Sequence, residues 1–135
     1  MKKVIVLICL VLSLSACSSQ KQVSNSITLF IEIVDETKGD ANVLFSEQVN
    51  VENVVTLSDA IRQVESIQLE YIETKDGLII EGFLGTRGDW EKGPWWFISS
   101  SNNEGCVKMG YCLGANDVIV SDNDEFTFTL TSEFE

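Results

Sequence analysis

The sequence predicts an α+β fold in which a β-grasp-like mixed sheet carries one short helix packed on one face. Apolar and polar residues alternate through most of the chain after residue 27, which is typical of half-buried strands. One segment alone, 56–66, has a helical period, and it follows two predicted strands and precedes several more. A helix with a single apolar stripe needs a sheet face to cover it. This order of elements is that of a β-grasp domain.

The first two strands are predicted at 27–35 and 43–51, where the chain is ITLFIEIVD and VLFSEQVNV. Leu29, Ile31 and Ile33 fall on one face of the first strand because side chains alternate along a strand. The turn-rich KGDAN segment at 38–42 separates the two runs. The sequence therefore predicts an N-terminal hairpin.

The predicted helix is TLSDAIRQVES, at 56–66. Its apolar residues recur at helical spacing and form one stripe: Leu57, Ala60, Ile61 and Val64. Thr56 and Asp59 are three positions apart, which resembles a capping box, and Asp59 lies where the helix dipole favours negative charge. We expect a helix of about ten residues that begins at this cap.

After the helix the chain returns to strands. The stretch 68–85 is predicted as a second hairpin because Asp76-Gly77, a strong turn signal, separates two alternating runs. GPWWFISS at 93–100 is a further strand, with a loop before it at 85–93 and a polar, glycine-rich loop after it at 101–117. The last strand places Phe126, Phe128 and Leu130 on one face. We expect residues 28–135 to form a single domain.

The chain opens with MKKVIVLICLVLSLSAC. Its apolar run of about eleven residues is too short to span a membrane, which takes roughly 20, and the preceding lysine pair is typical of a signal peptide. Leu14-Ser15-Ala16-Cys17 resembles the lipobox of bacterial lipoproteins, which implies cleavage before Cys17 and a diacylglycerol thioether on that residue. We expect residues 1–16 to be a lipoprotein signal peptide and 17–27 a flexible tether. The predicted location is the extracytoplasmic face of the cell membrane, with the lipid anchor at Cys17.

The composition excludes several function classes. The full chain has a net charge of −12, and without Lys2 and Lys3 of the leader it reaches −14. Such acidity is unfavourable for binding nucleic acid, which requires clustered Lys and Arg. Histidine is absent, which removes the commonest general base and the usual metal ligand. We therefore predict no metal site, no cofactor and no enzyme activity.

Two cysteines remain in the predicted domain, Cys106 and Cys112, within GCVKMGYC. In an oxidising compartment such a pair is first interpreted as a disulfide, although a functional thiol pair is the alternative. Five intervening residues do not match the spacing of a redox motif, and no further Cys or His completes a zinc site.

From Thr56 onward the chain resembles the transcobalamin-like domain, the C-terminal β-domain of transcobalamin and intrinsic factor that also occurs in bacterial surface lipoproteins. The resemblance lies in three segments: the helix start TLSDAI, the strand GPWWFISS and the chain end SDNDEFTF. In that family a central strand carries a tryptophan, which Trp96 matches, and an Asp-Gly-Asp turn precedes the last strand. Here Asn123 replaces the glycine, and asparagine tolerates a left-handed backbone. The resemblance implies a small-molecule ligand of the corrinoid class.

The adjacent tryptophans at 95 and 96 point to opposite faces of a strand. If Trp96 is the core residue, Trp95 and Phe97 project the other way. Two interpretations remain open: the 101–117 loop folds back over Trp95 and forms a small second core, or Trp95 and Phe97, together with Trp90 and Tyr111, form an apolar ligand-binding patch.

Three functions are compatible with the sequence. The leading hypothesis is a non-catalytic, lipid-anchored module that binds a small molecule or a surface protein. The second is a structural lipoprotein that pairs with a partner through an exposed sheet edge. The third is a small surface hydrolase that uses two carboxylates. The acidic turn at 122–125 is predicted to be solvated, with calcium binding as the alternative, because it lacks the spacing of an EF-hand.

Overall fold

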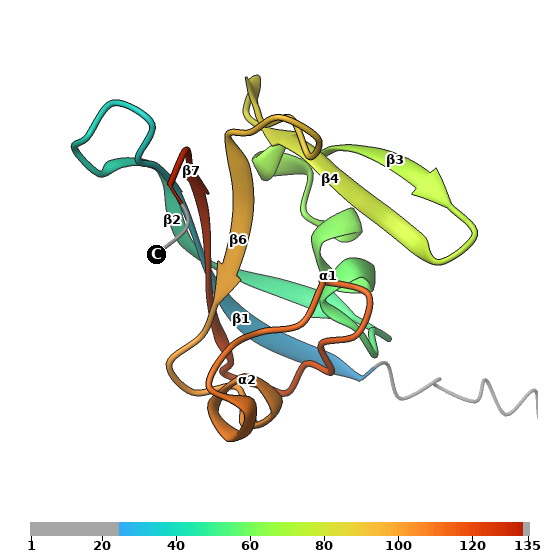
Figure 1. Ribbon diagram of the computed structural model, residues 1–135. Coiled ribbons are helices and arrows are strands. Elements are labelled where there is room, and N and C mark those ends of the chain that lie inside the picture. The colour runs from blue at the N-terminus through green and yellow to red at the C-terminus, as the bar shows by residue number, and fades with distance from the viewer. Residues whose placement is uncertain (1–24, 134–135) are drawn as a thin grey trace, which may run out of the picture.

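The computed structural model describes residues 25–133 (Figure 1). The predicted signal peptide and Cys17 lie outside the described residues. Within that range no helix is both long enough and apolar enough to cross a bilayer. The elements are β1 (Ser26–Asp35), β2 (Asn42–Glu52), α1 (Leu57–Gln63), a 3₁₀ turn (Glu65–Ile67), β3 (Glu70–Thr74), β4 (Gly77–Phe83), β5 (Thr86–Arg87), β6 (Trp95–Ser99), α2 (Glu104–Met109) and β7 (Glu125–Thr131).

The larger sheet has four strands in the order β2-β1-β7-β6. β1 runs parallel to β7, whereas the β1–β2 and β6–β7 pairs are antiparallel. α1 lies on one face of this sheet, between it and the β3–β4 hairpin (Figure 1). The predicted α+β class and the predicted N-terminal hairpin are confirmed. β2 and β6 form the two edges of this sheet, so pairing with a partner through an edge stays a prediction.

Two features of the architecture differ from the sequence prediction. The second hairpin does not join the main sheet: β3, β4 and the short β5 form a separate three-stranded sheet. The 101–117 segment is not only a loop, because it contains α2. Asn103 caps this helix by accepting a hydrogen bond from the backbone N–H of Cys106, and Gly110 ends it in a left-handed conformation.

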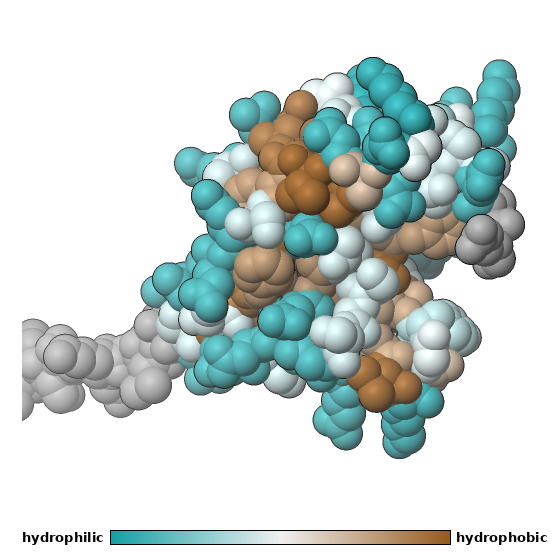
Figure 2. Space-filling view, turned by 90° about the vertical axis from the view of Figure 1, so that its left-hand side faces the viewer, coloured by the Kyte–Doolittle hydropathy of each residue, from teal (hydrophilic) through white to brown (hydrophobic). Residues whose placement is uncertain are grey.

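The core lies between the main sheet and the layer formed by α1 and the second sheet. Alternation along the strands supplies its side chains, as the sequence predicts. The fully buried residues of the central strands are Leu29, Ile31, Ile33, Phe126, Phe128 and Leu130. α1 contributes Leu57, Ala60 and Ile61. The opposite face of the main sheet carries small, separate apolar patches among polar side chains (Figure 2).

The predicted capping box of α1 is present. The Thr56 side chain accepts a hydrogen bond from the backbone N–H of Asp59, and the Asp59 carboxylate accepts one from the backbone N–H of Thr56. The Thr56 hydrogen bond, with a second from the N–H of Val55, lowers the pKa of Asp59 below its ordinary value of 3.8. The helix start is therefore stabilised by the ionised form of this carboxyl group.

This capping carboxylate predicts a pH-dependent term in stability. Because the folded-state pKa of Asp59 is lowered, its contribution is fully present above pH 3.8 and is lost as the pH falls through the lower folded-state value. We expect Asp59→Asn to lower the free energy of unfolding at pH 7 by less than about 1 kcal/mol, since the group is exposed and screened. Urea unfolding of the variant and the parent at pH 7 and below pH 3 measures the difference between their free energies of unfolding. A difference between variant and parent that stays constant over this range would contradict the assignment.

The turn before β7 is only partly solvated, in contrast to the prediction. Asn123 does adopt a left-handed conformation, with φ of 67°. Asp122 accepts a hydrogen bond from the backbone N–H of Thr28 at 2.7 Å. Asp124, however, is 6% exposed and accepts hydrogen bonds from the backbone N–H of Ser121 and the side chain of Asn103. The turn is thus part of the structural hydrogen-bond network.

Candidate functional site

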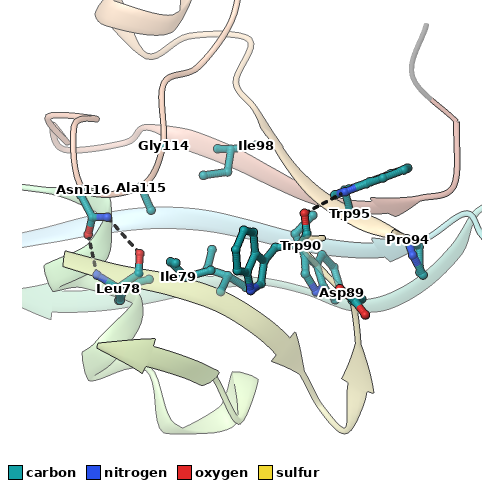
Figure 3. A pocket seen from close by; sticks show the side chains of 13 residues that line it. Leu78, Ile79, Asp89, Trp90, Pro94, Trp95, Ile98, Gly114, Ala115 and Asn116 are labelled. Atoms are coloured by element: carbon teal, nitrogen blue, oxygen red, sulfur yellow. Dashed lines mark hydrogen bonds between the residues drawn. The ribbon is translucent and has the colours of Figure 1, made fainter. Parts of the chain in front are cut away.

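A cavity of about 250 Å³ lies between β4 of the second sheet and β6 of the main sheet. One end is closed by the 88–94 loop and the other by residues 114–116. Its lining is mainly apolar and aromatic: Leu78, Ile79, Ile80, Gly88, Asp89, Trp90, Pro94, Trp95, Trp96, Ile98, Gly114, Ala115 and Asn116. The cavity is half-open to solvent, and its lining residues come from four separate segments (Figure 3).

The 88–94 loop is folded around Trp95. The indole N–H of Trp95 donates a hydrogen bond to the backbone oxygen of Trp90 at 3.2 Å (Figure 3). Gly93 lies against the indole in a left-handed conformation with φ of 78°, and a Cβ at that position would come within 2.6 Å of the ring. Any other residue at 93 would be strained and would displace the indole. The side chain of Trp95 is therefore half-buried by this loop.

The Asp89 carboxylate stabilises the same loop. It accepts hydrogen bonds from the backbone N–H groups of Glu91 and Lys92 at 2.9 and 3.2 Å. The loop closes through two backbone hydrogen bonds, from Asp89 to Pro94 and from Gly93 to Asp89. Trp90 is held at the tip with 58% of its surface exposed. The loop thus presents one indole to the solvent at the mouth of the cavity.

Trp96 forms the inner wall of the cavity. Its indole N–H donates to the backbone oxygen of Glu81 at 3.2 Å. Its ring meets the ring of Phe83 edge-on, with the centroids 4.9 Å apart. Trp96 also packs against the core, as the sequence predicts for this position. The two adjacent tryptophans therefore differ: one is anchored in the core and the other is held by the 88–94 loop.

Asn116 fixes the far end of the cavity. Its side chain accepts a hydrogen bond from the backbone N–H of Leu78 and donates one to the backbone oxygen of the same residue (Figure 3). It also accepts a hydrogen bond from the hydroxyl of Ser58 on α1 at 2.5 Å. This side chain links the 114–116 segment to β4 and to the helix. Gly77 passes so close that a Cβ there would lie 2.3 Å from the Asn116 side-chain oxygen.

The structure brings together two of the four residues predicted to bind a ligand. Trp90 and Trp95 line the same cavity. Phe97 is 39% exposed and does not line the cavity; it lies on the face of β6 to which strand alternation also directs the Trp95 side chain, and Trp95 borders the cavity only at the 88–94 loop. Tyr111 is 60% exposed and lines a different hollow, with Ile98, Ser99 and Val107. The 101–117 loop does not fold over Trp95; only its residues 114–116 reach the cavity.

Sequence reasoning missed the walls contributed by β4 and by Asn116. Ile79 and Ile80 are ordinary strand residues in sequence, and their position beside the tryptophans depends on how the two sheets pack. Asn116 lies in a polar loop where asparagine is common. A usable signal was present only in the 88–94 loop, where two glycines and Asp89 closely precede the tryptophan pair.

The lining of the cavity favours stacking and apolar contacts with a ligand over charge–charge contacts. Asp89 is the one ionisable residue in its lining. Hydrogen bonds from Thr37 lower the pKa of Asp35, and those from Thr56 and Val55 lower that of Asp59, but neither residue lines the cavity. Between residues 25 and 133, no three His, Cys, Asp or Glu side chains are grouped so that they could hold a metal ion.

The predicted disulfide is present: Cys106 on α2 is bonded to Cys112 just after it, with the Cα atoms 4.3 Å apart. Cys106 is buried against the core, and Cys112 packs partly against it. The disulfide therefore fastens α2 and the segment that leads toward residues 114–116, at the other end of the cavity from Trp90.

Comparison with known proteins agrees with this architecture. No family model matches the chain, and no curated protein matches it. Among solved structures, the chain is similar to a protein from Ruminococcus gnavus ATCC 29149 for which metal binding has been suggested, with 19% identity and a TM-score of 0.55, over 80% of this chain and 99% of that one. It also aligns with haptocorrin in complex with Cbi, with 16% identity and a TM-score of 0.49, over 78% of this chain and 25% of that one. At this level of identity, the likeness to the R. gnavus protein shows a shared fold.

Proposed function

We propose that this protein is a lipid-anchored, extracytoplasmic binding domain that holds a small molecule at the cavity between β4 and β6 and does not transform it. The anchor is inferred from the lipobox-like sequence that ends at Cys17. The single observation that carries the binding proposal is the exposed indole of Trp90, which a shaped loop holds at the mouth of an aromatic cavity. Ligand sites are typically concave and apolar with a few polar groups, as here.

The geometry narrows the class of ligand. At about 250 Å³ the cavity lies below the usual range for enclosing a drug-sized ligand, which is roughly 300–1,000 Å³. A larger ligand would therefore place one edge in the cavity and lie flat against the Trp90 ring. The indole N–H groups of Trp95 and Trp96 already donate to backbone oxygens. Binding would thus depend on stacking and apolar contact, with Asp89 as a hydrogen-bond acceptor at the rim.

A corrinoid is the first ligand to test. The segments TLSDAI, GPWWFISS and SDNDEFTF resemble the transcobalamin-like domain, and we propose membership of that family on this basis. A corrinoid would contact the cavity through one edge and the Trp90 ring through its face. The resemblance supports the class of ligand, and the size and lining of the cavity support this mode of contact.

Binding should depend on Trp90 and not on Phe97. We expect Trp90→Ala to weaken the affinity at least tenfold, since removing a stacking aromatic costs more than about 1.4 kcal/mol. Phe97→Ala is the matched control: it removes another exposed aromatic, from a strand residue outside the cavity, and should change the affinity less than about twofold. The full chain is titrated with cobinamide and with a panel of small metabolites, and binding is followed by thermal shift and by tryptophan quenching.

Three results would count against the proposal. Equal losses in the two variants would show that the cavity is not the site. Absence of binding across the whole panel would contradict small-molecule binding. Chemical conversion of a bound ligand would contradict the non-catalytic assignment.

A further inference from the structure

Exposed apolar side chains are concentrated at one end of the domain. Between residues 25 and 133, eleven large apolar side chains are exposed. Six of them lie on α2, shortly after it, or beside it: Val55, Val107, Met109, Tyr111, Leu113 and Ile119. Exposed apolar clusters on soluble domains mark interaction surfaces.

Three of these side chains share one surface, which we call the apolar patch: Met109, Leu113 and Ile119. Met109, Leu113 and Ile119 line one groove of about 230 Å³ between α2 and residues 117–121. The groove continues toward the start of α1, because residues 56 and 119 form a β-bridge and the backbone N–H of Val120 donates to the oxygen of Val55 at 3.1 Å. Ile119 is 60% exposed.

The described chain begins at this same end of the domain. Asn25 exchanges hydrogen bonds with Asn53, three residues before Thr56, which is bridged to Ile119. The backbone N–H of Thr28 donates to Asp122, three residues after Ile119. α2 and the start of β1 lie together at the lower end of Figure 1, whereas the β1–β2 turn lies at the upper end. The ten residues of β1 separate these two ends by about 30 Å.

The predicted lipid anchor is attached close to this end. Asn25 follows Cys17 by only eight positions, and a chain of that length spans at most about 30 Å when fully extended. An acylated Cys17 would therefore keep the apolar patch within reach of the bilayer, and the β1–β2 turn could approach only if the domain lay on its side. The patch and the attachment point are thus on the same side of the domain.

We propose that the apolar patch rests on the lipid surface, with its three side chains at the boundary between headgroups and acyl chains. This inference rests on the lipid anchor of the proposed function. The domain then stands on the membrane with the 88–94 loop away from it, because β6 runs from this loop toward α2 (Figure 1). Apolar side chains add binding energy to an acyl anchor in proportion to the area they bury.

The charge of the domain specifies the kind of lipid. Glu104 and Asp117 line the groove with a single cation, Lys108. The chain without its leader also carries a net charge of −14. Anionic headgroups would repel this surface. Contact is therefore expected with zwitterionic lipid and should weaken as anionic lipid is added at low salt.

A probe attached to the patch tests the proposal. The full, processed chain is prepared as Leu113→Cys, labelled with an environment-sensitive dye and reconstituted in phosphatidylcholine vesicles that contain nitroxide-bearing lipid. The native thiols do not compete, because Cys106 and Cys112 are disulfide-bonded and Cys17 is acylated in the proposed form. We expect emission from residue 113 to fall about twofold, as for a group at the interface. The control is Lys38→Cys on the exposed β1–β2 turn, which should be quenched far less.

A second pair of variants tests the contact itself. In the Leu113→Cys chain, Ile119→Asp should remove the quenching, whereas Val43→Asp, which changes a similarly exposed side chain at the other end, should leave it unchanged.

Equal quenching at 113 and 38, or none at 113 on a protein that floats with vesicles, would overturn this inference alone. A protein that does not float, with no lipid on its N-terminal peptide by mass spectrometry, would overturn the proposed anchor and this inference together. Neither of these outcomes is expected to affect cobinamide binding, so the cavity proposal is tested separately.

Discussion

Replacing Asn103 by aspartate is expected to lower the free energy of unfolding at pH 7 by about 3 kcal/mol or more. Asn103 is 2% exposed, and its side-chain amide donates to the backbone oxygen of Ile119 and to the carboxylate of Asp124, at 2.8 and 2.7 Å. Its side-chain oxygen accepts from the backbone N–H of Cys106. Aspartate has the same shape but no donor, so two buried carboxylates would face each other.

The pH dependence identifies the cause of this loss. Two neighbouring carboxylates raise the pKa of one of them in the folded state. The destabilisation is therefore full above the raised pKa and decreases as the pH falls through it, when one carboxyl group regains a proton to donate. Urea unfolding of variant and parent between pH 4 and 8 measures this difference. Gln48→Glu adds the same charge at an exposed site opposite Phe30 and should stay within about 0.5 kcal/mol of the parent.

Two outcomes would contradict the assigned role of Asn103. One is a loss no larger than that of Gln48→Glu. The other is a large loss that does not change with pH, which would indicate a packing defect in place of electrostatic repulsion.

Phe83→Ala is expected to destabilise the protein by about 3–5 kcal/mol. Phe83 ends β4 and is fully buried. Its ring lies 4.9 Å from the rings of both Trp96 and Phe128, measured between centroids. One side chain therefore joins the second sheet to two strands of the main sheet. Its removal leaves a cavity at this junction and takes away the support behind Trp96.

The measurement compares three variants by urea unfolding. Phe83→Leu keeps most of the volume and should cost less than Phe83→Ala. Phe97→Ala removes the same ring from a partly exposed position and should cost the least. The Phe83→Ala protein should also bind cobinamide more weakly, because Trp96 forms the inner wall of the cavity. If Phe83→Ala costs no more than Phe97→Ala, this ring does not hold the two sheets together.

The features that sequence could predict share a local origin. The capping box depends on Thr56 and Asp59, three residues apart, and the disulfide on Cys106 and Cys112, six apart. Strand alternation places Phe126 and Phe128 in the core without reference to any other segment. The left-handed Asn123 likewise follows from the tolerance of asparagine for that conformation. Each of these signals lies within a short stretch of consecutive residues.

The features that sequence missed depend on contacts between distant segments. Asn103 meets Asp124 across 21 positions, so a turn predicted to be solvated is in part buried. Asn116 joins Leu78 across 38 positions and closes the cavity. Phe97 and Tyr111 are aromatic like Trp90, yet strand direction and the position of α2 place them on other surfaces. No local pattern distinguishes these side chains from ordinary loop and strand residues.

The sequence by itself determined the α+β class, the order of strands and helix, and the side chains that enter the core, because hydrophobic periodicity and capping act over a few residues. Only the tertiary structure decided that the second hairpin forms its own sheet, that Trp90 and Trp95 share a cavity while Phe97 and Tyr111 do not, and that the apolar patch lies beside the start of β1. These arrangements arise when separate elements pack together. The free energy of that packing depends on contacts between two segments, so it cannot be inferred from the sequence of either segment alone.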